Sequence, residues 1–229
     1  ENPNTPYACY AEVTNLLNGL SSLSGTYTVA DVIASQGSNQ STGISAGWTL
    51  FVIYEDPTLH MKSFTVFDGF SYIDDSHFTL IPVSGFKTPP SGPVDLQFAY
   101  ATLDGDKPKG GTKLEIGSKE VTTPLRPANN FFISTIENTN GVQTPRNPSG
   151  SNTLGYDTGA LEIKGADPEY IKNNQSSTSF TLQVAKGQSD PIFAFFSAYA
   201  VDIIAPKIDL TKLVKNTSGV NVGGANVNL

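Results

Sequence analysis

The chain has 229 residues, 38% of them hydrophobic, with one cysteine and a formal net charge of −7. A nucleic-acid-binding protein normally carries a basic patch, and no such patch is present in this sequence. Basic residues are also too sparse for binding to an anionic membrane surface. No run of 18 or more apolar residues occurs, so we expect no membrane insertion.

Cys9 cannot form an intrachain disulfide, because it has no partner. Cysteine is among the most buried residue types, so we predict that Cys9 is a small buried hydrophobe. The sequence starts at Glu1 without a Met or a leader segment. We therefore expect a mature or excised piece of a longer protein.

Polar and apolar segments alternate over short distances along the whole chain. Twenty-one Gly and 15 Pro punctuate it, and Ser, Thr and Asn fill the gaps between apolar runs. This pattern is typical of an all-β protein with many turns. Residues 1–6 are polar and predict a linker, whereas Ala11–Leu20 predicts a short helix with an apolar face.

The stretch Gly47–Phe70 holds two β-rich runs, Trp48–Tyr54 and Phe64–Phe67, on either side of a polar turn. The first run is almost continuously apolar, which is typical of a strand covered on both faces. We therefore expect a central antiparallel pair, with Trp48 in the core. Asp68–Gly69 is expected to turn the chain after the second strand.

The remaining apolar runs have strand length and lie between turn-forming residues. Their spacing predicts one antiparallel β-sandwich, of jelly-roll or immunoglobulin-like type, over residues 7–205. The strands are expected near Tyr27–Ile33, Trp48–Tyr54, Phe64–Phe67, Phe78–Val83, Leu96–Leu103, Lys113–Ile116, Phe131–Ile136, Phe180–Val184 and Ile192–Ile204.

Residues 206–229 differ in composition and are expected to form a linker or the first strand of a following module. Lys207 and Lys212 lie there, and an intramolecular Lys–Asn isopeptide bond is one possibility for such a lysine. No partner asparagine can be identified from the sequence, and buried lysines are rare unless paired.

Several segments together resemble a known module. They are YACYAEVT, GTYTVADV, AGWTLFVIYEDP, FTVFDGF, ATLDGD, TLGYDTG and AVDIIAPKIDLTKLVKN. In this order they resemble a module of very large, repetitive cell-surface proteins of Bacteroidota, including SprB-type gliding-motility adhesins. The resemblance runs from about Tyr7 to Lys215. The tail after Lys207 resembles the start of an immunoglobulin-like repeat.

The resemblance implies a β-sandwich module in a protein exported by the type 9 secretion route to the cell surface. It implies adhesion or stalk-building, with neighbouring modules of the same chain as partners, and it implies no catalytic residues. One departure concerns the segment after LDGD, where the family pattern has a second Gly-Asp and this chain has Gly111–Thr112.

The sequence gives little support for an enzyme. His60 and His77 are the only histidines, and neither has the spacing of a zinc site. No G-x-S-x-G nucleophile elbow is present. We expect no catalytic residues; a cleft with a perturbed carboxylate pair would revive a hydrolase.

Calcium is the one cofactor that the residues suggest. Asp104 and Asp106 flank Gly105 in an expected turn, and carboxylate oxygens are ligands that Ca²⁺ prefers. Asp is also a common turn former, because it bonds to its own backbone. Both readings of this pair stay open.

Glycan binding is the natural activity of an adhesin. Sugar sites combine an exposed aromatic ring with carboxamides or acids. Tyr72, Tyr156 and Tyr170 lie near expected loops with Asn or Asp neighbours, so they are the candidate ligand-binding residues. Each could instead be a half-buried rim residue.

The sequence thus predicts a non-enzymatic, extracellular adhesin module that acts as spacer or binding head. A glycan-binding, lectin-like module is one alternative. Another is a subunit of a surface filament, in which the tail Lys207–Leu229 adds a strand to a neighbour's open edge.

Overall fold

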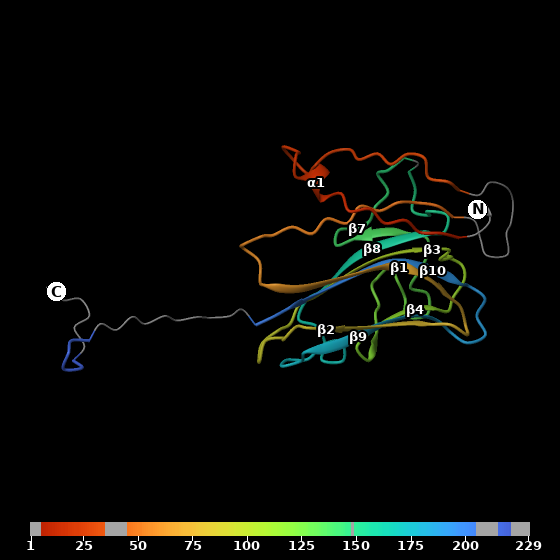
Figure 1. The fold of residues 1–229 in the computed structure, drawn as a ribbon. Coiled ribbons are helices and arrows are strands. Elements are labelled where there is room, and N and C mark those ends of the chain that lie inside the picture. Colours follow the sequence, from red (N-terminus) through yellow and green to blue (C-terminus); the bar gives the residue numbers. More distant parts are fainter. Residues whose placement is uncertain (1–5, 35–44, 148, 205–214, 221–229) are drawn as a thin grey trace.

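The computed structural model describes residues 6–34, 45–147, 149–204 and 215–220 as two stacked β-sheets with a long N-terminal segment (Figure 1). These residues form one helix and ten strands. They are α1 (Thr14–Leu17), β1 (Lys62–Ile73), β2 (Thr79–Ser84), β3 (Leu96–Leu103), β4 (Thr112–Ile116), β5 (Lys119–Glu120), β6 (Ile136–Asn138), β7 (Gly141–Val142), β8 (Tyr156–Ile163), β9 (Ser177–Val184) and β10 (Ile192–Asp202). The prediction of an all-β sandwich is confirmed.

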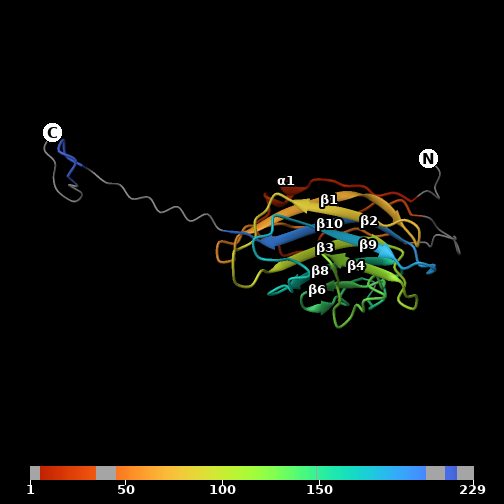
Figure 2. The same cartoon turned by 90° about the horizontal axis from the view of Figure 1, so that it is seen from below.

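The strand order is that of a jelly roll. One sheet has the order β1-β10-β3-β8-β6-β7 and the other β2-β9-β4-β5. The first strand therefore pairs with the last, the second with the ninth and the third with the eighth, all antiparallel. This nested pairing, distributed over two sheets, distinguishes the jelly roll from the immunoglobulin-like alternative. Figure 2 shows the strands of both sheets from below.

Most strands after residue 60 lie where the sequence predicts them. β3 has the predicted bounds, and β2, β4, β9 and β10 differ from the predictions by a few residues at their ends. These segments alternate apolar and polar residues, or are short apolar runs bounded by turns, so local pattern was sufficient to locate them.

The predictions for the N-terminal strands are wrong. Tyr27–Ile33 and Trp48–Tyr54 are irregular and pair with neither sheet. Trp48 is 43% exposed instead of buried. The run Trp48–Tyr54 lies against the outer face of the six-stranded sheet, so it is covered on one side only. A continuous apolar run does not distinguish this arrangement from a central strand.

The second member of the expected central pair is an edge strand. Phe64–Phe67 lies within β1, whose only sheet partner among the described residues is β10. Asp68–Gly69 does not turn the chain, because β1 continues through a register shift between Asp68 and Ser71. A bulge lets two strand segments join without a turn. The middle of the six-stranded sheet is formed by β3 and β8, with β10 between β1 and β3.

Three smaller predictions also differ from the structure. Phe131–Thr135 is buried but irregular, and only Ile136 belongs to a strand. Cys9 is exposed instead of buried. The helix within Ala11–Leu20 exists but is only four residues long.

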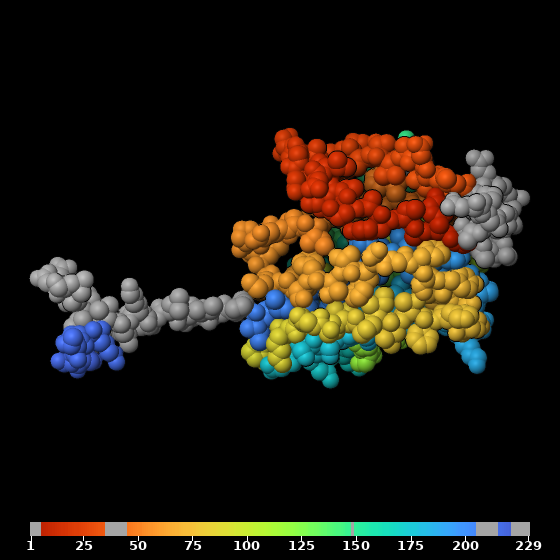
Figure 3. Space-filling model, in the orientation of Figure 1, coloured from red at the N-terminus to blue at the C-terminus, as the bar shows by residue number. Residues whose placement is uncertain are grey.

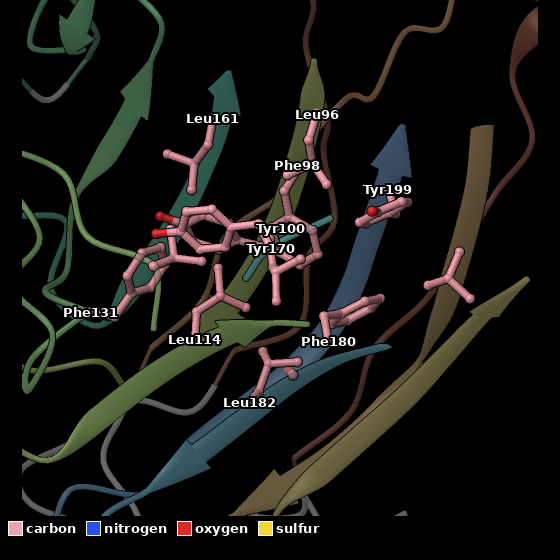
Figure 4. Packing of buried hydrophobic residues seen from close by; sticks show 14 of the residues in the cluster. Leu96, Phe98, Tyr100, Leu114, Phe131, Leu161, Tyr170, Phe180, Leu182 and Tyr199 are labelled. Carbon is pink, nitrogen blue, oxygen red and sulfur yellow. The ribbon is translucent and has the colours of Figure 1, made fainter. Parts of the chain in front are cut away.

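The core lies between the inner faces of the two sheets (Figure 4). Phe180 of β9 is fully buried and packs edge-on against Phe98 of β3, with ring centroids 4.9 Å apart. The buried side chains come from four strands: Leu96, Phe98 and Tyr100 from β3, Ile192, Tyr199 and Val201 from β10, Leu114 and Ile116 from β4, and Phe180 and Leu182 from β9. Burial of these side chains is the main source of stability.

Residues 206–229 are described only from 215 to 220, where Asn216 closes a turn onto Val220. Lys207, Lys212 and the predicted tail strand otherwise lie outside the described residues. No helix in the described part of the chain is long and apolar enough to span a membrane.

Candidate functional site

Three aspartates gather at the loop end of the sandwich. Asp104 follows β3 with φ +71°, and its N–H donates to the carbonyl of Gly155 at 2.6 Å. The N–H of Asp106 donates to Oδ2 of Asp190 at 3.3 Å. The ammonium of Lys109 lies 2.7 Å from Oδ2 of Asp106 and 3.8 Å from Oδ1 of Asp190. Tertiary structure thus adds Asp190 and Lys109 to the predicted pair.

Two of these carboxyl groups hold their protons unusually tightly. Burial, and then the charge of Asp106, raise the pKa of Asp104 to about 7. The same two causes raise the pKa of Asp190 to about 7, against the opposing charge of Lys109. Carboxylates crowded in a partly buried loop disfavour one another's ionisation. Such shifts occur at functional sites and in structural clusters alike.

The arrangement of Asp104, Asp106, Asp190 and Lys109 can be compared with what a calcium site requires. Within the described residues, no group of three or more acidic, His or Cys side chains is arranged to hold a metal ion. Lys109 supplies a positive charge beside Asp106. Calcium binding at Asp104 and Asp106 stays a prediction.

Gly111 lies directly before β4 in a backbone conformation that favours glycine. Its φ is +115°, and a Cβ there would lie 2.6 Å from the side chain of Gln188. Its carbonyl accepts the N–H of Ala185 at 2.8 Å. The position therefore requires glycine, and the residue fixes the start of β4 against the loop that precedes β10.

The three predicted ligand-binding tyrosines do not lie together. Tyr72 is 42% exposed at the end of β1 and contacts the ring of Phe193. Tyr156 is buried, and Tyr170 is buried with its hydroxyl donating to the carbonyl of Glu120 at 3.0 Å. Of the three, Tyr72 alone exposes much of its ring, and glycan binding by these residues stays a prediction.

Tyr156 instead anchors the segment that crosses the outer face of the six-stranded sheet. We name residues 45–61 the strap (orange in Figures 1 and 3). Gly47 has no space for a side chain, because the Tyr156 ring occupies the position of its Cβ. Thr49 Oγ1 hydrogen-bonds to the Tyr156 hydroxyl. Phe51 stacks on Phe196 of β10, with ring centroids 3.5 Å apart and planes 18° from parallel.

A cavity of about 390 Å³ lies between the strap and the sheet. The strap residues Leu50, Phe51 and Ile53 form one wall, and Phe196 lies on the sheet side. A second cavity of about 500 Å³ lies between the 121–125 loop, the β6–β7 hairpin and β8. Glu137 and Glu162 line both cavities. Volumes of this size are typical of small-ligand sites.

A buried ion cluster supports the wall that contains Glu137. Arg126 is fully buried; its Nε donates to Oε2 of Glu137 at 2.7 Å and its Nη1 to Oδ1 of Asp157 at 2.8 Å. Its other donors reach the carbonyls of Phe131 and Thr135. No local sequence pattern predicts this cluster, because its members come from a loop, β6 and β8.

Comparison of the chain with known protein families, with curated proteins and with solved structures gives no match. The assignment of a function therefore depends on the residues and the geometry described above, together with the resemblance noted in the sequence.

Proposed function

We propose that this chain is a non-enzymatic module of a secreted bacterial surface adhesin, acting as a spacer or binding head. The observation that supports this most is the position of β10, the last strand before residue 204. It lies between β1 and β3 and is hydrogen-bonded to both along its length. Antiparallel ladders on both sides let the strand that leads out of the domain resist extraction.

The mild acidity of the chain and its family resemblance agree with a surface location. A jelly roll by itself does not, because one fold supports many functions. The direct test is an antibody raised against the whole chain and applied to intact cells of the source organism. We expect labelling without permeabilisation. Labelling that requires permeabilised cells would refute the proposal.

A second candidate is saccharide binding at the two cavities that share Glu137 and Glu162. Carboxylates beside an apolar wall provide acceptors for hydroxyl groups and a surface for the sugar ring. The test uses beads coated with the chain and washed under flow over immobilised polysaccharides. We expect retention that Glu162→Gln reduces and that Lys172→Gln, an exposed control, leaves unchanged. Equal retention of both variants would reject this site.

The raised pKa values of Asp104 and Asp190 are the feature that favours a hydrolase. Neither of the two cavities includes these aspartates, so we rank hydrolysis below binding. Release of reducing sugar from the retained polysaccharide, lost in Asp104→Asn, would reverse this order.

A further inference from the structure

The chain enters and leaves the paired strands at the same end of the sandwich. Lys62, the first residue of β1, is the register partner of Asp202, the last residue of β10. The ammonium of Lys62 lies 2.6 Å from Oδ1 of Asp202, and both side chains are largely buried. Asp202 also accepts the N–H of Asp95 at 2.9 Å. We name the ion pair between Lys62 and Asp202, which joins the two strands at this end, the clasp.

Tension applied directly at Lys62 and Asp202 would act on neighbouring ends of an antiparallel pair. The hydrogen bonds of such a pair run perpendicular to the strands. Pulling at adjacent ends therefore opens them one after another, beginning at the clasp. Pulling at opposite ends would load the whole ladder along its length at once.

The strap moves the point of attachment to the opposite end. Ser45 and Gly47 contact Gly155 and Tyr156. Tyr156 pairs with Leu103 at the far end of β3, whereas Leu96, at the near end, pairs with Val201 beside the clasp. The strap therefore runs the length of the sheet from its anchor to Lys62, as the orange trace in Figure 1 shows.

The strap is held by few interactions. Among the described residues, no backbone hydrogen bond joins 45–54 to either sheet. Residues 45–54 are held by the Gly47 and Thr49 contacts with Tyr156 and by the Phe51–Phe196 stack. At the other end of the strap, the carbonyl of Met61 accepts the N–H of Ile203 at 3.1 Å. Ile53 and Tyr54 are 55% and 69% exposed. Segments with few buried contacts open at lower free energy than the core.

We propose that residues 45–61 are a releasable tension strap. While it is docked, tension from the N-terminal side enters at Tyr156 and acts along the length of the sheet. When it detaches, the load moves to the Lys62–Asp202 clasp and the outer face of β10 around Phe196 is uncovered. The strap thus yields before the sheets and adds length to the chain without unfolding the core.

The first test is force spectroscopy of the whole chain held at its two termini. The variant Gly47→Cys/Tyr156→Cys, with Cys9→Ser, locks the anchor as a disulfide when oxidised. The Tyr156 ring occupies the position of a Cβ at residue 47, so replacing that ring by the shorter cysteine side chain frees the space in which the two sulfurs would meet. Reduced and oxidised states of one protein then form a matched pair, and the native chain, which keeps the Tyr156 anchor, is measured beside them and should show the same early step as the reduced variant.

We expect the reduced protein to show an early step of up to about 60 Å of contour, less the length that the strap already spans. The oxidised protein should lack this step. Traces that are identical in the two states would overturn the proposal. If the cysteine variant does not fold, Phe51→Ala in the native background should lower the force of the early step, and Trp48→Ala should change it less.

A second test needs no applied force. Trp48 is the only tryptophan and lies within the strap. In a urea titration of the whole chain, we expect Trp48 fluorescence to change at a lower concentration than far-ultraviolet circular dichroism, because the strap detaches first. Coincident transitions by the two probes would contradict the proposal.

The relevance of tension depends on the proposed adhesin function, but the docking of the strap does not. The force and fluorescence measurements use the isolated chain, whereas cell labelling tests the surface location. A failure of the strap proposal is therefore distinguishable from a failure of the proposed adhesin function.

Discussion

Arg126 and Asp157 form an ion pair in which both side chains are fully buried, with 2.8 Å between Nη1 and Oδ1. Burial outweighs the attraction of Arg126 and raises the pKa of Asp157 to about 6. Among the described residues, the hydroxyl of Tyr100, whose ring lies beside the Arg126 guanidinium, has no hydrogen-bond partner. The pair therefore joins β8 to the 126–135 loop at an electrostatic cost.

We expect Arg126→Met to destabilise the fold by roughly 3–5 kcal/mol at pH 7, because it leaves Asp157 buried and uncompensated. The loss should be smaller at about pH 5, because Asp157, with a pKa of about 6, is then largely neutral. Urea denaturation at the two pH values measures both effects. The double variant Arg126→Met/Asp157→Leu should recover part of the loss, and no recovery would argue against this explanation.

Asp190 should make stability depend on pH. Its folded pKa of about 7 exceeds the ordinary value of 3.8, so the folded state binds the proton more tightly. Stability should therefore fall as pH rises from about 4 to about 7 and stay level above that range.

We expect Asp190→Asn to reduce this slope and to stabilise the fold at pH 8 by roughly 1–2 kcal/mol, a value reduced for the nearby Lys109 charge. Asp167→Asn is a control of opposite direction, because hydrogen bonding to Lys119 lowers the pKa of Asp167. The measurement is the melting temperature of each variant across pH 4–8. An unchanged slope in Asp190→Asn would exclude Asp190 as the source of the pH dependence.

Lys109 provides a test of the calcium prediction. Its ammonium supplies a cation among Asp104, Asp106 and Asp190. We expect millimolar calcium to shift the melting temperature of the native chain by less than about one degree relative to EDTA, and that of Lys109→Met by several degrees. A larger shift in the native chain, abolished by Asp104→Asn, would instead establish the site at Asp104 and Asp106.

Phe180 should be a major contributor to stability. It is fully buried and contacts Phe67 and Phe98 across the sandwich. We expect Phe180→Ala to cost roughly 3–5 kcal/mol, through lost burial and the cavity that it leaves. Phe78→Ala is the matched control, because Phe78 is 65% exposed and should change the free energy of unfolding by less than about 0.5 kcal/mol. Similar losses for both variants would contradict the assignment of the core.

The sequence by itself determined the fold class and most strands after residue 60. β3 and β9 show why: their apolar residues are spaced for one buried face, and turn-forming residues bound them, so local pattern carries the information. The acidic loop after β3, which contains Asp104 and Asp106, is predicted for the same reason, although the hydrogen-bonded turn itself lies at 106–109.

Only the tertiary structure decided which segments pair, and therefore what lies central or outside. Trp48–Tyr54 has the composition of a buried strand, yet it crosses the outer face of a sheet as part of the strap. Asp190 joins Asp106, and Arg126 joins Asp157, across long stretches of chain. Burial and electrostatic contact between such distant residues are properties of the assembled sheets, and the periodicity of a single segment does not encode them.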